Sequence, residues 1–368
     1  MREANVAPGV HRYQWFVPIL LLNHASKREE DSAVRLPAAL ALALAIVCQG
    51  QPVLHLDAGP LQLNITISET AQLFHVVDQL SEWSEFSHRQ YGRYFRDTGG
   101  GLSDEDRKLL SDHAAIRRTY GWGKGPEQVF YTSLDLDQAL QAGVTRGDLT
   151  EAEAGTERAV LTHFRPRVDK LIAESPAVPE FARELENKRQ ELAEFAAQAA
   201  RFTGVSPAQA LPFYLIANPD ENSIGGGYNG GQITLEIPRK RDAYFTLLHE
   251  LFHAFLELQK SKVKPVLKSV PGLDFSTLNE GLAYALSPGI LHTGSKDQLA
   301  ASVGADLAKG PPLTDSYTRY HRYGLALRPL LREALNQPGQ TLETFLPRAI
   351  DAWRVLVELD AARVQPTK

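Results

Sequence analysis

Apolar residues recur at helical spacing along most of the chain, and two short segments instead alternate as strands do. The pattern is helical over about 68–203 and again over about 242–359. Between these stretches, residues 211–217 and 232–237 are strand candidates that end at turn-forming residues. We therefore expect a predominantly helical α+β fold that contains a small sheet.

Two helices are predicted with particular clarity. In the first, over 103–119, Ser103 is a candidate N-cap and Asp106 completes a weak capping box three residues later. In the second, residues 178–203 carry apolar side chains at 3.6-residue spacing with charges on the other side, which predicts one long helix.

Glycine clusters predict irregular segments between these elements. Residues 225–231 are mostly glycine and lead into the 232–237 strand, as either a flexible lip or a long hairpin turn. Trp122 lies between two glycines in a predicted loop. A packed loop anchor is favoured there over a ligand contact.

The change in pattern near residues 203–206 predicts the domain organisation. We expect residues 1–50 to be a signal-like segment, residues 51–204 to form a helical N-terminal lobe, and residues 205–368 to form a second lobe with the strands.

The N-terminal segment predicts export from the cytoplasm. Residues 36–47 form a twelve-residue apolar run that is preceded by Arg35 and is too short to span a bilayer. Cys48 and Gly50 have the spacing of a cleavage site, so the mature chain is expected to begin near Gln49 to Pro52, in the periplasm, in the cell envelope or outside the cell. Two alternatives stay open, a buried helix and lipid attachment at Cys48.

Composition narrows the classes of function. The chain has 39 Lys and Arg against 44 Asp and Glu, a net charge of −5 and no long basic run, so nucleic-acid binding is not expected. A single cysteine excludes an intrachain disulfide and a zinc site of the CxxC type. A metal site must therefore use histidine and carboxylate ligands. Nothing in the sequence indicates an oligomeric state.

The chemistry is concentrated in an HExxH motif at residues 249–253. His249 and His253 are one helical turn apart, about 40° around the axis, so both imidazoles can bind a single ion. Glu250 projects beside them and is placed to act as general base on a metal-activated water. The alternative is a set of polar residues on an amphipathic helix, but the apolar flanks argue against a solvated face.

The third metal ligand is predicted downstream. The metzincin pattern requires Gly and His where this chain has Leu256 and Gln259. Glu280 instead lies in an Asn-Glu-Gly motif 27 positions after His253, beyond a predicted loop with Pro265 and Pro271. Over about residues 211–290 the chain resembles the gluzincin group of zinc metallopeptidases.

This resemblance implies a zincin-like catalytic lobe with Zn²⁺ bound by His249, His253 and Glu280 and with Glu250 as general base. It also implies that an edge strand binds extended substrate, for which we expect residues 232–237 to serve. The sequence departs from the group in two respects. It lacks a motif that captures a substrate α-amine, and Tyr284 stands where thermolysin-like relatives have Asp.

A donor for the transition-state oxyanion is expected from the aromatic cluster at 317–323. Tyr320 and His321 are the candidates, with Tyr323 beside them, although an aromatic stripe that only packs the helix is favoured. The other histidines singled out show no ligand spacing and are expected to be surface or packing residues. These are His75, His88, His113 and His163.

We expect an exported zinc metallopeptidase that cleaves peptide or protein substrates through a metal-activated water. No stable membrane insertion is expected beyond the signal segment or a lipid anchor. Two alternatives remain, a non-catalytic binding protein on a zincin scaffold and a hydrolase of non-peptide amides. Retention of Glu250 favours catalysis over the first.

Overall fold

The computed structural model of the chain describes residues 54–98, 101–240, 242–286 and 311–364. These residues form a predominantly helical α+β structure with one mixed sheet of five strands. The chain divides into two units between residues 47 and 48, and every described residue belongs to the unit of residues 48–368. The apolar run at 36–47 and the cleavage region lie outside the described residues, so export stays a prediction.

The sheet has the strand order β1-β2-β3-β5-β4. An antiparallel hairpin of β1 (Leu54–Ala58) and β2 (Leu61–Thr66) begins it. Parallel pairing then joins β2 to β3 (Leu211–Ala217) and β3 to β5 (Gln232–Ile237). The edge is β4 (Gly225–Asn229), which is antiparallel to β5.

The sheet crosses the domain boundary expected near residue 204. The predicted strands at 211–217 and 232–237 are confirmed, but β1 and β2, which the sequence analysis did not predict, come from the segment before the boundary. Buried and exposed side chains alternate in β2, where Leu61, Leu63 and Ile65 are buried. That alternation is present in the sequence, but its shortness hides it beside the helical pattern that follows.

Helices fill the chain between β2 and β3, as the periodicity predicts. The capping box at the start of α4 is present, since Ser103 Oγ accepts from the backbone N–H of Asp106 while the Asp106 carboxylate accepts from that of Ser103. The helices are α2 (Glu69–Leu80), α3 (Gln90–Thr98), α4 (Asp104–Tyr120), α5 (Pro126–Phe130), α6 (Leu136–Arg146) and α7 (Glu151–Ala173).

The single long helix expected over 178–203 is wrong. The structure has α8 (Ala177–Asn187) and α9 (Arg189–Thr203), which are separated by Lys188 at φ −95° and ψ 9°. At this bend the chain changes direction, so that α8 packs under β3 and α9 under β1. Apolar spacing continues through the bend because both helices face the same core, which is why periodicity alone does not reveal it.

The chain after the sheet is helical, as expected, but the loop predicted around Pro265 contains a short helix. Pro265 is the sixth of the eight residues of this helix and has no backbone N–H, so the helix forms without the hydrogen bond that this position would otherwise donate. The helices are α10 (Tyr244–Glu257), α11 (Lys260–Leu267), α12 (Phe275–Leu286), α14 (Ser316–Asn336) and α15 (Leu342–Val364).

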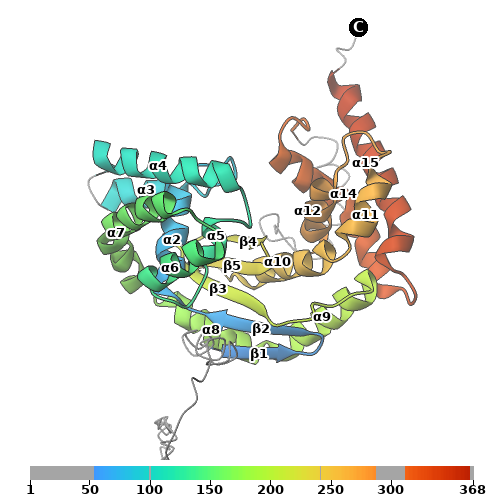
Figure 1. Cartoon of the computed structure of the whole chain (residues 1–368). Coiled ribbons are helices and arrows are strands. Elements are labelled where there is room, and N and C mark those ends of the chain that lie inside the picture. The colour runs from blue at the N-terminus through green and yellow to red at the C-terminus, as the bar shows by residue number, and fades with distance from the viewer. Residues whose placement is uncertain (1–53, 99–100, 241, 287–310, 365–368) are drawn as a thin grey trace, which may run out of the picture. The chain divides into compact units, whose positions relative to one another are not determined.

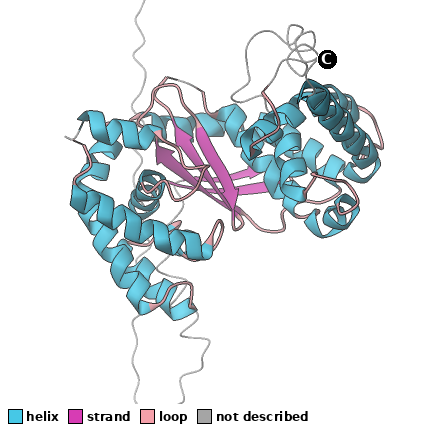
Figure 2. Cartoon of the chain, turned by 90° about the horizontal axis from the view of Figure 1, so that it is seen from above, coloured by secondary structure: helices cyan, strands magenta, loops and turns pink. Residues whose placement is uncertain are grey.

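Within residues 48–368, two groups of helices flank the sheet. In Figure 1, α2 to α7 gather on the left and α11, α12, α14 and α15 on the right, with β4, β5 and α10 between them. Seen from above in Figure 2, the sheet again lies between helices. None of the described helices combines the length and the apolarity needed to cross a membrane.

Candidate metal centre and cleft

Helix α10 carries the HExxH motif with its three polar side chains largely buried. His249, Glu250 and His253 are 7%, 6% and 5% exposed. Apolar side chains of the same helix anchor it in the core, among them Leu251 and Phe252, which are both fully buried. Burial on this scale requires partners for the polar groups, because an unpaired buried imidazole or carboxylate is costly.

Helix α12 supplies the partner, since Glu280 faces the two histidines. Its Oε2 lies 3.5 Å from Nε2 of His249 and 3.7 Å from Nε2 of His253. The two Nε2 atoms are 3.1 Å apart. The structure thus brings together the three residues that the sequence analysis predicted as ligands, and one ligand atom from each lies within 4.8 Å of the others.

These three atoms fit a tetrahedral metal ion. Zinc binds histidine nitrogen at roughly 2.0–2.1 Å, so neighbouring ligand atoms of a tetrahedral site are separated by about 3.3 Å. The separations of 3.1, 3.5 and 3.7 Å bracket this value. Two nitrogens and one carboxylate oxygen are also a ligand set that zinc takes in catalytic sites, with the fourth position open.

Asn279 orients one of the ligands, a role that the sequence analysis did not assign. Its Oδ1 lies 3.1 Å from Nδ1 of His253. An amide oxygen only accepts, so the imidazole Nδ1 donates, and in the neutral ring Nε2 keeps its lone pair for a metal. The signal in the sequence is the Asn next to Glu280 on the same helix.

Glu250 lies beside the ligands, against the edge strand. Burial raises the pKa of its carboxyl group above the ordinary value. A Cβ on Gly226 of β4 would lie 3.0 Å from both Cγ and Oε1 of Glu250, so only glycine leaves the carboxylate its full space there. Burial would also raise the pKa of Glu280, but the charges of His253 and His249 hold it below its ordinary value.

Tyr284 is the aromatic residue next to the histidines, and the sequence analysis noted it only as a departure from a family pattern. It follows Glu280 by one turn of α12, and its ring centroid is 4.6 Å from that of His249. Its phenol is also a cleft-lining group. Burial, followed by the charge of Glu280, raises its pKa well above 10.0.

The two predicted oxyanion donors occupy different positions. Tyr320 lines the cleft, with its hydroxyl 3.3 Å from Oγ of Ser276. His321 lies behind Tyr284, at a ring distance of 4.3 Å, and does not line the cleft. Burial lowers the pKa of His321 to about 4. Tyr323 is fully buried and donates to the backbone oxygen of Ala349, which is a packing role.

The candidate metal centre opens into a cleft of about 870 Å³. Its lining includes Phe86 and Trp122 from the segment before β3 and the α14 residues Tyr317 and Tyr320. The rings of Phe86 and Tyr320 lie nearly parallel at 6.4 Å. Trp122 packs 4.6 Å from Trp83, in line with a loop anchor, and it also lines the cleft.

Strand β4 forms the sheet edge along this cleft, so the expectation that residues 232–237 are the edge strand is wrong. Those residues are β5, which pairs with β3 on one side and β4 on the other. The glycine-rich 225–229 segment, expected as a lip or turn, is the strand at the edge. Glycines have no side-chain alternation from which a strand could be predicted.

The four histidines without ligand spacing do not join the metal centre, and each faces a carboxylate. His75 and His113 are buried rather than on the surface, at 4% and 0% exposed. Their partners, and those of His88 and His163, come from distant parts of the chain. The pairs are His75 and His88 with Glu236, His113 with Asp78 and Glu157, and His163 with Asp106.

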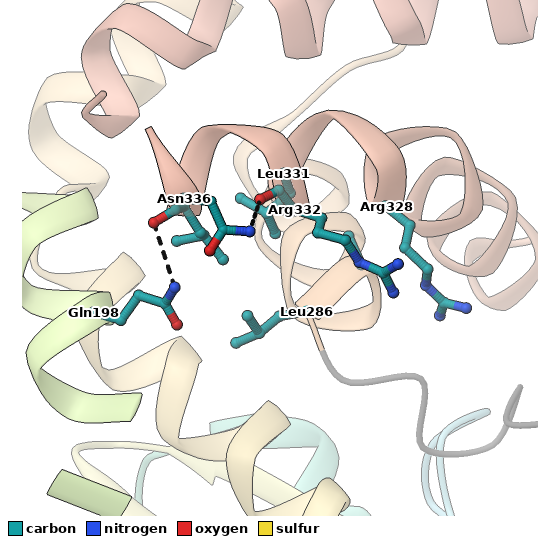
Figure 3. Close-up of a pocket in the computed structure, with 8 residues that line it drawn as sticks. Gln198, Leu286, Arg328, Leu331, Arg332 and Asn336 are labelled. Atoms are coloured by element: carbon teal, nitrogen blue, oxygen red, sulfur yellow. Dashed lines mark hydrogen bonds between the residues drawn. The ribbon is translucent and has the colours of Figure 1, made fainter. Parts of the chain in front are cut away.

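A smaller cavity of about 190 Å³ lies between α9, α12 and α14 (Figure 3). Gln198, Arg332 and Asn336 are among the residues that line it. Arg328, also in its lining, donates from Nη2 to the backbone oxygen of Tyr284, in the last turn of α12. The lining of this cavity, as far as the described residues show, includes no carboxylate or imidazole.

No family model, curated protein or solved structure matches this chain.

Proposed function

We propose that the protein is a zinc-dependent metallopeptidase of the zincin type. The observation that carries this proposal is the set of three ligand atoms of His249, His253 and Glu280, 3.1–3.7 Å apart at the foot of a cleft. A buried carboxylate, Glu250, lies directly beside them. An HExxH helix, a second helix with a glutamate ligand and an edge strand together support the gluzincin arrangement.

The side chains divide the chemistry between them. When bound, zinc supplies a Lewis acid that polarises a carbonyl and lowers the pKa of water to about 7. Glu250 accepts the proton of the attacking water and passes it to the leaving amine, a task helped by its raised pKa. Asn279 keeps His253 in the tautomer that binds metal.

The edge strand favours peptides over other amides as substrates. Strand β4 is the outermost strand of the sheet among the described residues and lines the cleft, and an extended peptide can add to such an edge through main-chain hydrogen bonds. A small non-peptide amide has no extended main chain with which to form these hydrogen bonds.

The oxyanion donor is proposed to be a phenol of the cleft wall. Tyr320 and Tyr284 both line the cleft, whereas His321 does not. Replacement of the donor by Phe is expected to lower kcat by about 10²-fold or more with little change in KM, because the hydrogen bond forms only in the transition state. Kinetics of Tyr320→Phe and Tyr284→Phe would identify it.

Glu250→Gln is the decisive test of catalysis. We expect the variant to keep its zinc, since Glu250 is not a ligand, but to lose turnover by at least 10³-fold, since an amide cannot accept the water's proton. A peptide-library digest followed by mass spectrometry provides the activity, and metal analysis provides the zinc content. A variant within tenfold of wild type would show that Glu250 is not the base.

Matched variants separate this effect from general damage. Glu257→Gln changes a glutamate two turns later on α10, where it pairs with Lys260, and should leave turnover within about threefold. His253→Ala removes a ligand and should abolish stoichiometric zinc, whereas His163→Ala, at a carboxylate pair away from the cleft, should not.

A further inference from the structure

A second cluster of polar side chains is centred on Glu236 of β5, which is fully buried. Its carboxylate is 2.7 Å from Nε2 of His75 and 2.7 Å from Nδ1 of His88. It also accepts from the side-chain amides of Gln90 and Asn218, at 3.0 and 3.2 Å. Three of these partners come from the segment before β3, so the cluster joins that segment to the sheet.

His88 is the member of this cluster that reaches the cleft. Its side chain is 32% exposed, and it lines the cleft together with Glu250. The ring lies on Gly225 of β4, where a Cβ would be only 2.3 Å from Cε1. The backbone N–H of His88 donates to Oε1 of Gln79 at 2.7 Å, so both main chain and ring are held in place.

The hydrogen bonds leave one ring nitrogen for a ligand. Nδ1 donates to the Glu236 carboxylate, and Nε2 has no hydrogen-bond partner within the described part of the chain. Burial alone would lower the pKa of His88, but the charge and hydrogen bond of Glu236 raise it above the ordinary value. The protonated ring donates from Nε2, and a carboxylate is the strongest partner for such a donor.

Anchoring the loop does not require this histidine. Without His88, Glu236 still accepts from His75, Gln90 and Asn218, and Gln79 holds the main chain. A purely structural side chain would also gain nothing from facing the cleft.

His88 and Glu250 lie against two consecutive residues of β4, on opposite faces of the strand. A Cβ on Gly225 would meet His88, and a Cβ on Gly226 would meet Glu250. Side chains of a strand added beside β4 alternate in the same way. The substrate residue that faces His88 is therefore next to the one that faces Glu250.

We propose that His88 is a specificity-determining residue that binds a substrate carboxylate through Nε2, one residue away from the substrate residue that faces Glu250. Calling the bound peptide a substrate rests on the proposed function, but binding of its carboxylate by His88 does not depend on turnover. The carboxylate belongs either to an Asp or Glu side chain or to the C-terminus of a peptide.

The experiment compares wild type with His88→Gln and His88→Phe, where Phe keeps a ring on Gly225 without a nitrogen. Peptide pairs that differ only as Glu against Gln, or as free against amidated C-terminus, distinguish the two sources of the carboxylate. We expect wild type to prefer one carboxylate form at least tenfold in kcat/KM, mainly through KM. Both variants should lose that preference and cleave the uncharged peptides within threefold of wild type.

Two controls keep the outcome specific. Lys124→Gln removes an exposed cationic side chain from the lining of the same cleft and should retain the preference. Thermal unfolding of each variant identifies any that does not fold. If either His88→Gln or His88→Phe fails to fold, the other variant tests the proposal.

A binding arm separates this inference from the proposed function. In the Glu250→Gln background, fluorescence titration with the same peptides should give a Kd at least tenfold lower for the carboxylate form, and His88→Phe should remove the difference. Wild type that binds the carboxylate form but cleaves nothing would contradict the peptidase alone. Three results would overturn the role of His88. The protein could bind the carboxylate and uncharged peptides with equal affinity, it could bind neither peptide, or the His88 variants could change the affinity for both peptides equally.

Discussion

Single residues at the candidate metal centre divide into proposed ligands, a proposed base and supports. That the proposed ligands and base lie together could be predicted, because HExxH and Asn-Glu-Gly are local patterns whose spacing fits helices. Asn279 was missed although it adjoins Glu280, because its contact with Nδ1 of His253 depends on how α10 and α12 pack. Tyr284 was missed for the same reason.

Asn279→Ala is expected to weaken zinc binding 10- to 100-fold, because His253 loses the partner that fixes its tautomer and ring orientation. Competition with a chromophoric chelator measures the change. Ser276→Ala is the control and should leave the affinity within twofold, because Ser276 lies on the same helix but its hydroxyl is hydrogen-bonded to Tyr320 rather than to a proposed ligand. Equal affinities for wild type and Asn279→Ala would assign His253 another support.

Elements were predicted well where side chains carry a pattern and poorly where they do not. The β3 and β5 strands and α4 with its cap follow from apolar alternation and the Ser103 box. Strand β4 could not be predicted, because a strand of glycines has no faces to compare. Its place at the edge comes from pairing with β5, which is a long-range property of the sheet.

Gly226→Ala in β4 is expected to lower kcat by about tenfold or more while the protein stays folded. The added Cβ would lie 3.0 Å from Glu250, tighter than ordinary contact, and a shift of the base by a fraction of an ångström is costly. Gly227→Ala is the matched control and should leave kcat within twofold. Its Cβ would lie 3.0 Å from the end of the flexible Asn229 side chain and 3.6 Å from Oγ1 of Thr234, which is an ordinary contact. Similar losses for both would point to the strand backbone instead.

At the scale of the whole molecule, buried charges join helices that the sequence separates widely. His113 of α4 is fully buried, 2.9 Å from Glu157 of α7 and 3.2 Å from Asp78 of α2. Arg117 is also fully buried and donates to Asp78 at 2.6 Å. The sequence analysis expected such histidines to be surface or packing residues, since pairs more than 30 positions apart leave no local signal.

His113 should make stability depend on pH on the alkaline side. Burial alone would lower its pKa, but the carboxylates of Glu157 and Asp78 raise it to about 9. Because the pKa of His113 is higher in the folded protein than in the unfolded chain, protonation of His113 stabilises the folded state. This contribution to the free energy of unfolding, about 3 kcal/mol, is fully present below about pH 6.5 and is lost as the pH rises to 9.

Urea unfolding at pH 6 and pH 9.5 measures this contribution. His113→Gln should flatten the difference between the two conditions, whereas His163→Gln, at a partly exposed pair with Asp106, should preserve it. An identical pH dependence in wild type and His113→Gln would assign the loss of stability to other groups.

The parallel pairing of β2 with β3 has a consequence for the order in which the molecule folds. Leu63 is adjacent to Leu211 in the sheet, and α2 to α9 all lie between them in the chain. Pairing of strands so distant in sequence carries a large loop-closure cost and is slow. Because β5 joins the sheet through β3 and carries β4 at its edge, the strand that shapes the cleft is assembled only after more than half of the chain has been synthesised. The helices of that half can form earlier from local contacts, so their docking, rather than their formation, is expected to limit when the cleft is complete.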